Sequence, residues 1–175
     1  MDHLLMRLTS LANIPPIPDL PAGYTLRDYR DDDLIGLAEM LQLAFDDVAW
    51  SPDLVRERLI DAADVKRTFI IDFGGAPVAT ASARIMPEEF PDSGYVHWVA
   101  VHPDHRGKQL GKIVTLAVLE EFVRLGCTDA VLETEDHRLA AIRLYKELGF
   151  EEVHKHHSHS VRWAIIADML ASANL

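Results

Sequence analysis

Apolar residues along the chain recur with two periods, one typical of strands and the other typical of helices. Runs rich in β-branched and aromatic residues predict strands over 25–30, 68–85, 94–103 and 129–135. Gly74 and Gly75 divide the second run into a hairpin. Helical spacing predicts helices over 34–45, 51–63, 110–126, 139–149 and 162–173. A hairpin region followed by a β-α-β-α series predicts an α+β fold with a mixed sheet.

Four prolines interrupt this alternation in the segment NIPPIPDLPAG, residues 13–23. Proline lacks an amide donor and fixes φ, so the segment is expected to be extended and semi-rigid. We therefore predict a Pro-rich N-terminal arm over residues 1–23. Residues 24–175 are predicted to form a single domain, whose ordered part begins near Tyr24.

Composition narrows the class of protein. A chain of 175 residues can bury a core without covalent staples, and a single cysteine, Cys127, excludes a disulfide framework and a Cys-rich zinc site. No run of about 18 apolar residues and no signal-peptide pattern is present, so a cytoplasmic protein is expected. The net charge of −11 argues against nucleic acid or an anionic membrane as a partner.

The segment WVAVHPDHRGKQLGKIV, residues 98–114, carries the most chemical information. A predicted strand ends at Pro103, a basic loop follows, and a helix begins near Leu110. Amides at a helix start form an anion site suited to a pyrophosphate, and Gly107 and Gly111 permit close approach of a ligand. Positive charge comes from Arg106, Lys108 and Lys112. Taken alone, the loop is equally consistent with a plain strand-to-helix connection.

Two motifs together resemble the GNAT superfamily of N-acetyltransferases. VHPDHRGKQLGK matches its acyl-CoA loop, Arg/Gln-x-x-Gly-x-Gly/Ala, and RLAAIRLYKELGFEEV matches its Ala-x-x-x-Tyr-x-x-x-Gly-Phe helix. The resemblance covers residues 24–155. It implies a GNAT-like central mixed, mostly antiparallel sheet flanked by helices. It also implies an acyltransferase that moves acetyl from acetyl-CoA directly to a primary amine of a small molecule or peptide.

The resemblance also implies a set of binding residues. The main chain of Val99, Ala100 and Val101 would hold the pantetheine arm, on a strand that separates from its neighbour. The pyrophosphate would lie in the loop formed by Arg106, Gly107, Lys108, Gln109, Leu110, Gly111 and Lys112. Gln109 replaces the usual middle glycine, and its amide can still face a phosphate if its φ is negative. Arg138 replaces a frequent asparagine and either contacts the ligand or pairs with Asp136.

Direct transfer requires a base, because free alkylamines have pKa values near 10 and the attacking amine must be neutral. Glu133 is the leading candidate, on a strand face with Val131; the alternative is a solvated carboxylate. His97 competes, on a face expected to include Val99; the alternative is a scaffold histidine. Tyr145 would lie near the thioester sulfur as the acid, or be a half-buried core tyrosine. A strand amide around Val99 would stabilise the oxyanion.

Other functions stay open at this stage. A catalytically silent acyl-CoA-binding sensor would carry the same motifs. A third reading is a metal protein built on the histidines of HKHHSHS, residues 154–160, which place two histidines on each face of a predicted strand. No cysteine or acid there completes a tetrahedral zinc site, so no metal is expected. A homodimer is a further open alternative.

Acidic residues gather around the two predicted helices over 34–63 and in the loop before residue 94. They are Asp28, Asp31, Asp32, Asp33, Asp46, Asp47, Asp53, Glu88, Glu89 and Asp92. If they border the acceptor cleft, they form a negative funnel that attracts a cationic amine. Alternatively, they are solvated faces that serve solubility.

Overall fold

The computed structural model describes residues 3–45 and 48–172, which form a seven-stranded sheet of order β2-β3-β4-β5-β6-β1-β7. The strands are β1 Leu4–Leu8, β2 Tyr24–Asp28, β3 Val65–Phe73, β4 Ala76–Ile85, β5 Ser93–Val101, β6 Asp129–Thr134 and β7 Glu151–Val153. Neighbouring strands are antiparallel except for β5 and β6, which are parallel. The predicted mixed, mostly antiparallel sheet is therefore confirmed.

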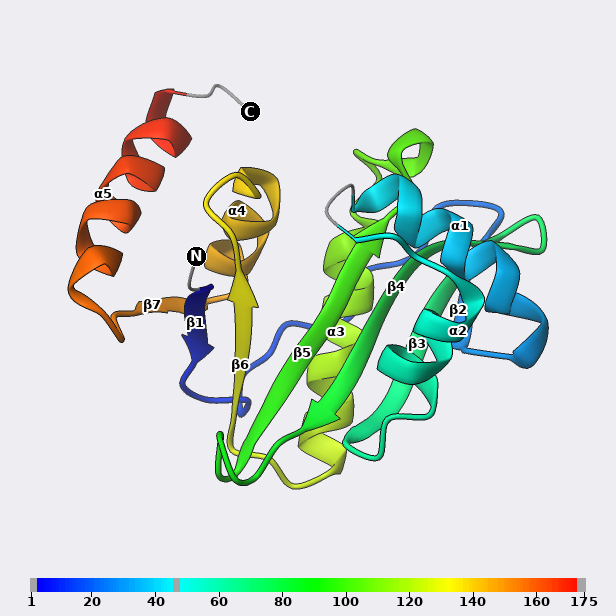
Figure 1. Cartoon of the computed structure of the whole chain (residues 1–175), viewed down its shortest axis with the longest axis horizontal. Helices are drawn as coiled ribbons and strands as arrows, with labels where there is room; N and C mark the ends of the chain where they lie inside the picture. The colour runs from blue at the N-terminus through cyan, green and yellow to red at the C-terminus, as the bar shows by residue number, and fades with distance from the viewer. Residues whose placement is uncertain (1–2, 46–47, 173–175) are drawn as a thin grey trace.

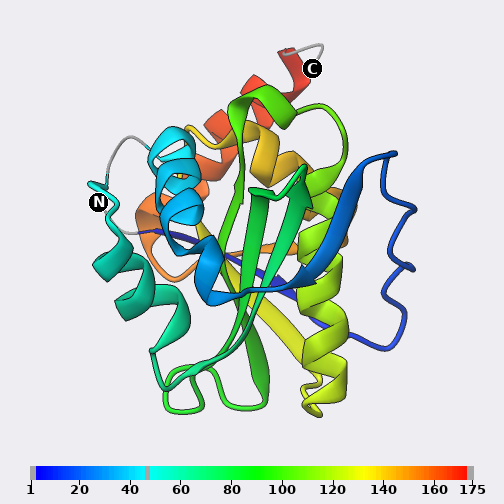
Figure 2. The same ribbon diagram turned by 90° about the vertical axis from the view of Figure 1, so that its right-hand side faces the viewer.

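Helices cover both faces of this sheet. They are α1 Leu34–Ala44, α2 Pro52–Val55, α3 Leu110–Arg124, α4 Leu139–Glu147 and α5 His157–Ser172. The yellow-green α3 and the cyan α1 lie on opposite sides of the green strands (Figure 2). A Cβ at Gly94 of β5 would lie 2.2 Å from Phe122 Cγ, so glycine is required where α3 meets the sheet. Within the described ranges, no helix has the length and apolarity needed to cross a membrane.

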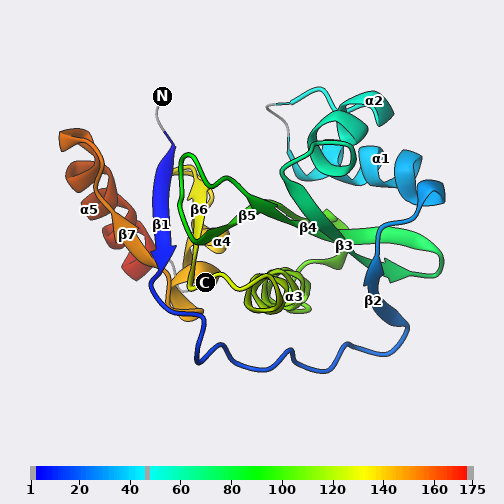
Figure 3. The same ribbon diagram turned by 90° about the horizontal axis from the view of Figure 1, so that it is seen from below.

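The N-terminus corrects the prediction that the ordered domain begins near Tyr24. β1 pairs with β6 on one side and β7 on the other, and Leu4 and Met6 are fully buried. Leu11 is buried in the hydrophobic core between α3 and the sheet, which we call the α3 core. The Pro-rich segment that follows runs along the side of α3 that faces away from the sheet (Figure 3). Leu4, Leu5 and Met6 are all buried, so β1 shows no two-residue alternation, and a short apolar run of this kind cannot be told from a helical segment in the sequence.

The C-terminal histidines also differ from the prediction. β7 ends at Val153 and α5 begins at His157, so the histidines do not share a strand. His159 is fully buried, and its Nδ1 accepts a hydrogen bond from the Lys155 amide at 3.4 Å. Helix α5 therefore begins five residues earlier than predicted, because burial of His159 and Trp163 extends it toward β7.

The predicted helix over 51–63 is shorter and irregular. Ser51 caps α2, since its side chain accepts a hydrogen bond from Leu54 N at 3.2 Å, and Pro52 takes the first helical position as expected. After Val55 the backbone widens into a π-helical turn, Arg56–Ile60, which ends the helix. Such turns are rare and occur frequently at functional sites.

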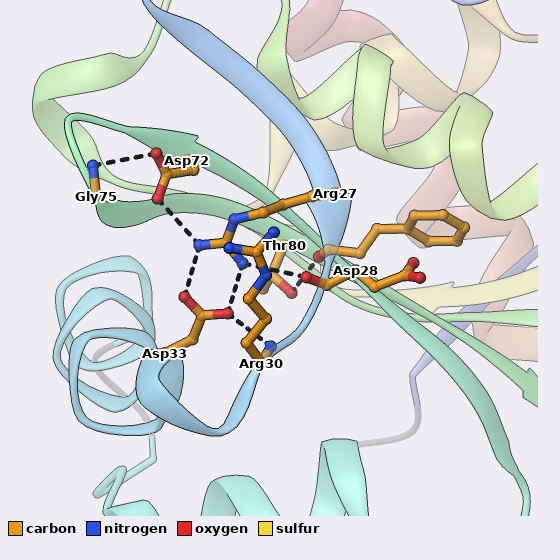
Figure 4. A network of polar contacts seen from close by, with 8 residues as sticks. Arg27, Asp28, Arg30, Asp33, Asp72, Gly75 and Thr80 are labelled. Atoms are coloured by element: carbon orange, nitrogen blue, oxygen red, sulfur yellow. Dashed lines mark hydrogen bonds and ion pairs between the residues drawn. The ribbon is translucent and has the colours of Figure 1, made fainter.

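A buried ion pair joins the start of α1 to the sheet (Figure 4). Arg27 of β2 donates to both carboxylate oxygens of Asp33, at 2.6 and 2.7 Å, and to Asp72 at 3.0 Å. Asp33 also accepts from the Arg30 amide at 2.8 Å, and Asp72 accepts from the Gly75 amide of the hairpin. Burial opposes ionisation of Asp33, but the hydrogen bonds from Arg27 and Arg30 outweigh it and lower its pKa.

Candidate functional site

The central strand β5 contains a bulge. Its pairing with β4 advances two residues on β4, from Thr80 to Ser82, while it moves three residues on β5, from Ala100 to His97. β5 therefore has one residue in excess. Trp98 within this interval has a φ of +48°, a left-handed conformation that residues with a side chain rarely adopt.

The bulge changes which side chains share a face. Val99 packs with the α3 core, whereas Trp98 packs with the cluster under α1 and α2. The ring centroids of His97 and Trp98 lie 5.6 Å apart, so the two side chains are on the same face of the sheet. The prediction that His97 shares a face with Val99 is therefore wrong, because an added residue resets the alternation of a strand.

β5 and β6 separate beyond the bulge. Their parallel pairing ends at Val96 with Leu132, although β5 continues to Val101 and β6 to Thr134. The two strands meet at their lower ends in Figure 1 and diverge toward the end nearest α4. The upper part of β5 thus lacks a partner strand on its β6 side in the described part of the chain. The separation implied by the family resemblance is present.

A cavity of about 1,020 Å³ occupies this region between β5, the start of α3, α4 and the end of α1. It is lined by these residues predicted to bind or react: Val99, Ala100, Val101, Arg106, Gly107, Gln109, Leu110, Gly111, Lys112, Arg138 and Tyr145. Three predicted residues do not line it, namely Lys108, Glu133 and His97. The structure thus brings eleven candidates into one groove and leaves both candidate bases outside it.

The sequence reasoning missed several groove residues. Leu43, Ala44 and Phe45 come from the end of α1, and His105 precedes the loop. His105 is anchored by the Tyr24 hydroxyl, which lies 2.8 Å from its Nδ1. Phe45 has a signal in the sequence, since it is an aromatic residue at the end of the helix predicted over 34–45.

The loop before α3 presents open amide donors to the groove. No side chain caps α3 within the described residues, and the first α-helical bond runs from Ile113 N to Gln109 O at 3.0 Å. The amides of the first helical residues are thus available to an anion. Gln109 has a φ of +59°, which corrects the expectation of a negative φ at this position. The left-handed conformation explains the glycine that the family motif usually places there.

Tyr145 of α4 is 6% exposed, and its side chain lines the groove. Burial raises its pKa to about 12, and the nearby charge of Arg138 opposes the shift. The hydroxyl is therefore protonated at neutral pH and can donate a hydrogen bond to a species in the groove.

Arg138 links the two sides of the groove. Its guanidinium lies 4.6 Å from the ring centre of Phe45, and its Nε donates to Glu135 at 3.0 Å. Asp136 is instead paired with Arg162 of α5, so the predicted Arg138–Asp136 pair is replaced by these two pairs. The segment between β6 and α4 is thereby joined to Phe45 at the end of α1 and to Arg162 of α5.

The two candidate bases lie on the sheet face that α1 and α2 cover in part. Glu133 is exposed and accepts a hydrogen bond from the Tyr95 hydroxyl at 3.1 Å. The ring of Tyr95 lies 5.9 Å from that of His97. Burial and the nearby charge of Arg84 lower the pKa of His97 to about 3. His97 is therefore neutral at physiological pH and holds a proton poorly.

The histidines near the C-terminus offer no metal site in the described structure. Among residues 3–45 and 48–172, no group of three or more His, Cys, Asp or Glu side chains is arranged to hold a metal ion. His156 and His159 contact each other through their rings, with centroids 5.1 Å apart. Independence from metal stays a prediction that a chelator experiment can test.

Comparisons with known proteins agree with this geometry. The family model described as Acetyltransferase (GNAT) family matches residues 34–150. A mycothiol acetyltransferase from Nocardia farcinica is 31% identical over 158 residues, which are 80% of this chain and 50% of that protein. The chain thus spans about half the length of the curated relatives it matches.

Solved structures share the fold. A GCN5-related N-acetyltransferase from Sphaerobacter thermophilus has a TM-score of 0.68 at 21% identity, over 87% of this chain and 48% of that one. AAC(6′)-Iy, in complex with the bisubstrate analogue CoA-S-monomethyl-acetylneamine, has a TM-score of 0.64 at 19% identity. That likeness covers 76% of this chain and 94% of the other.

Proposed function

Because the chain belongs to the acetyltransferase (GNAT) family, we propose that it is an N-acetyltransferase that uses acetyl-CoA to acetylate a primary amine by direct transfer. The observation that carries the proposal is the groove between the separated β5 and β6, which combines an open strand edge, open helix amides and a buried tyrosine. Neither a metal nor a nucleic acid nor a membrane enters the proposal.

In this proposal the upper part of β5 and the loop before α3 hold the co-substrate. The main chain of Val99, Ala100 and Val101 replaces the missing β6 pairing with hydrogen bonds to the amide-rich pantetheine arm. The amides from Gly107 to Lys112, together with the side chain of Arg106, hold the pyrophosphate. Lys108 lies outside the groove lining and contributes through its charge.

The transfer itself needs a proton acceptor and a stabiliser of the leaving group. The amine nitrogen forms a bond to the carbonyl carbon, the carbon–sulfur bond breaks, and the sulfur keeps the electron pair. The amine proton passes through water to the exposed carboxylate of Glu133. His97 serves as scaffold in this scheme, since its lowered pKa makes it a poor acceptor.

Tyr145 acts on the leaving group in this scheme. A tyrosine with a pKa of about 12 is a weaker acid than a thiol, whose pKa is about 8.5. Complete proton transfer to a thiolate is therefore unfavourable, and the hydroxyl instead donates a hydrogen bond to the sulfur as negative charge develops there.

Substitution of Tyr145 by phenylalanine tests this scheme. The Tyr145→Phe variant should bind acetyl-CoA with nearly unchanged affinity and acetylate amines with a kcat lower by roughly 10- to 100-fold, because the lost hydrogen bond forms mainly in the transition state. The measurements are calorimetric titration and steady-state release of CoA thiol.

Tyr29→Phe is the matched control, since its hydroxyl lies outside the groove lining and the substitution removes the same atom. An unchanged kcat in Tyr145→Phe would remove Tyr145 from the chemistry. Tight binding of acetyl-CoA without acetylation of any amine would favour the catalytically silent sensor instead.

A further inference from the structure

Five side chains form a continuous row on the sheet face opposite α3, which we call the β5 row: Arg58, Trp98, His97, Tyr95 and Glu133. Each member contacts the next. Arg58 lies 5.9 Å from the Trp98 ring, the rings of Trp98 and His97 are 5.6 Å apart, and those of His97 and Tyr95 are 5.9 Å apart. Tyr95 donates to Glu133 at 3.1 Å. The row thus has a guanidinium at one end and a carboxylate at the other.

Arg58 differs from its neighbours in having no carboxylate partner among the described residues. Arg56 is paired with Asp31 at 3.7 Å, and Arg84 is paired with Asp64 at 2.6 Å. Arg58 is exposed, and the interaction found for it among the described residues is with the face of the Trp98 ring. The π-helical turn Arg56–Ile60 and the left-handed backbone of Trp98 place these two side chains together. An oriented guanidinium without a partner is suited to bind a carboxylate.

Three buried nitrogen atoms near the row also lack hydrogen-bond partners: Trp50 Nε1, Trp98 Nε1 and His97 Nδ1. The two indoles are perpendicular, with ring centroids 4.7 Å apart, and Trp50 is only 8% exposed. Buried polar atoms are almost always paired in folded proteins, so each unpaired one requires an explanation. These atoms are shielded from solvent in this conformation, so a polar ligand would reach them only if neighbouring side chains moved.

The row is next to the groove. Trp98 immediately precedes Val99 and Ala100, which line the groove, and it contacts the groove residue Phe45 at 5.2 Å between ring centroids. A molecule on the β5 row therefore approaches the groove from the side opposite the α3 core.

We propose that the acceptor is an amine that also carries a carboxylate, with the carboxylate bound by Arg58 and the amino group directed past Trp98 into the adjoining groove. This inference rests on the proposed acetyl transfer and names the substrate class of the same site. It predicts amino acids or similar small zwitterions as acceptors, in preference to polyamines or neutral amines. Arg58 is then a residue that determines specificity and has no part in the chemical step.

The test is acetylation of matched pairs of acceptors, each an L-amino acid and its amide, with L-lysine and cadaverine as a further pair. The amino acid should exceed its amide in kcat/KM by about 10- to 100-fold, because one charge-assisted contact is lost in the amide. Arg58→Gln should abolish this advantage through KM and leave kcat nearly unchanged. Arg58→Lys should retain part of it. Arg56→Gln, which removes the same charge from the same turn, should leave it intact.

Equal use of amino acids and amides by the wild type, or an unchanged preference in Arg58→Gln, would overturn the inference. Acetylation confined to amines without a carboxylate would leave the proposed function standing and refute the role of Arg58. If no amine in the panel is acetylated, the proposed function fails and the inference fails with it.

Discussion

Gln109 holds a backbone conformation that residues with a side chain usually avoid. Its φ of +59° directs the chain from the end of the loop into α3, and its own side chain makes no cap to the helix. A left-handed residue other than glycine costs roughly 1–2 kcal/mol. The strained residue lies in the loop proposed to bind the pyrophosphate, next to the uncapped amides of α3.

Replacing Gln109 by glycine should therefore stabilise the protein. The relief of strain exceeds the added flexibility of glycine in the unfolded chain, so the free energy of unfolding should rise by roughly 0.5–1 kcal/mol. Affinity for acetyl-CoA should be retained, since the amide stays in place. Urea unfolding and calorimetric titration measure both quantities. Lys108→Gly, at a neighbouring position without a positive φ, should instead lose stability, and equal effects of the two substitutions would contradict the explanation.

Single residues show where sequence reasoning succeeds and where it stops. The motif spacing placed Tyr145 and Gly111 correctly in one groove. The face of His97 could not be derived, because the bulge at Trp98 depends on contacts with Trp50 and Phe45 from other segments. The pKa of His97 follows from burial and Arg84, and neither is visible in the sequence.

At the scale of elements, a largely buried ion pair anchors the start of α1, whose apolar face is also packed in a hydrophobic cluster. Arg27 and Asp33 are 15% and 4% exposed, and the pair joins β2 to the start of the helix. The other end of α1 reaches the groove, where Phe45 is part of the lining. The hairpin of β3 and β4 and helices α3 and α4 were predicted well. β1 was missed because its buried residues do not alternate, and the π-helical turn has no signature in the sequence.

Asp33→Asn should lower the free energy of unfolding by roughly 2–3 kcal/mol at neutral pH, because it leaves a buried guanidinium partly unpaired. The folded pKa of Asp33 is lowered, so its ionised form contributes stability above the unfolded pKa of about 3.9. The difference between wild type and variant should thus be full near neutrality and shrink as the pH falls through the folded pKa.

Urea unfolding at a series of pH values gives this difference directly. Asp28→Asn is the control, since the Asp28–Arg67 pair is exposed and should contribute less than about 1 kcal/mol. A difference that stays constant down to strongly acidic pH would show that the ion pair is not the source of the stability.

At the scale of the whole molecule, charge is distributed unevenly. Several acids of the expected negative funnel are paired, namely Asp28 with Arg67, Asp31 with Arg56 and Asp33 with Arg27, and Asp46 and Asp47 lie outside the described residues. The general attraction of a cationic acceptor is reduced by these pairs. The sequence showed the number of acids, but their pairing depends on the fold. The homodimer expected as an alternative stays a prediction.

In the proposed function the groove binds a polyanion within a protein of net charge −11. The salt dependence of binding separates attraction by the basic loop from repulsion by the acidic remainder of the surface. Charges farther than about 10 Å from the phosphates are largely screened at 0.1 M salt, so the acidic remainder of the surface contributes little. The basic loop lies next to the proposed position of the phosphates, and its attraction for them weakens as the salt concentration rises.

The dissociation constant for acetyl-CoA should therefore increase several-fold between about 0.05 and about 0.5 M salt. Lys112→Gln should reduce the slope, whereas Lys66→Gln, on β3 outside the groove, should not. Tighter binding at high salt, measured by calorimetry, would show that repulsion by the whole molecule outweighs the loop.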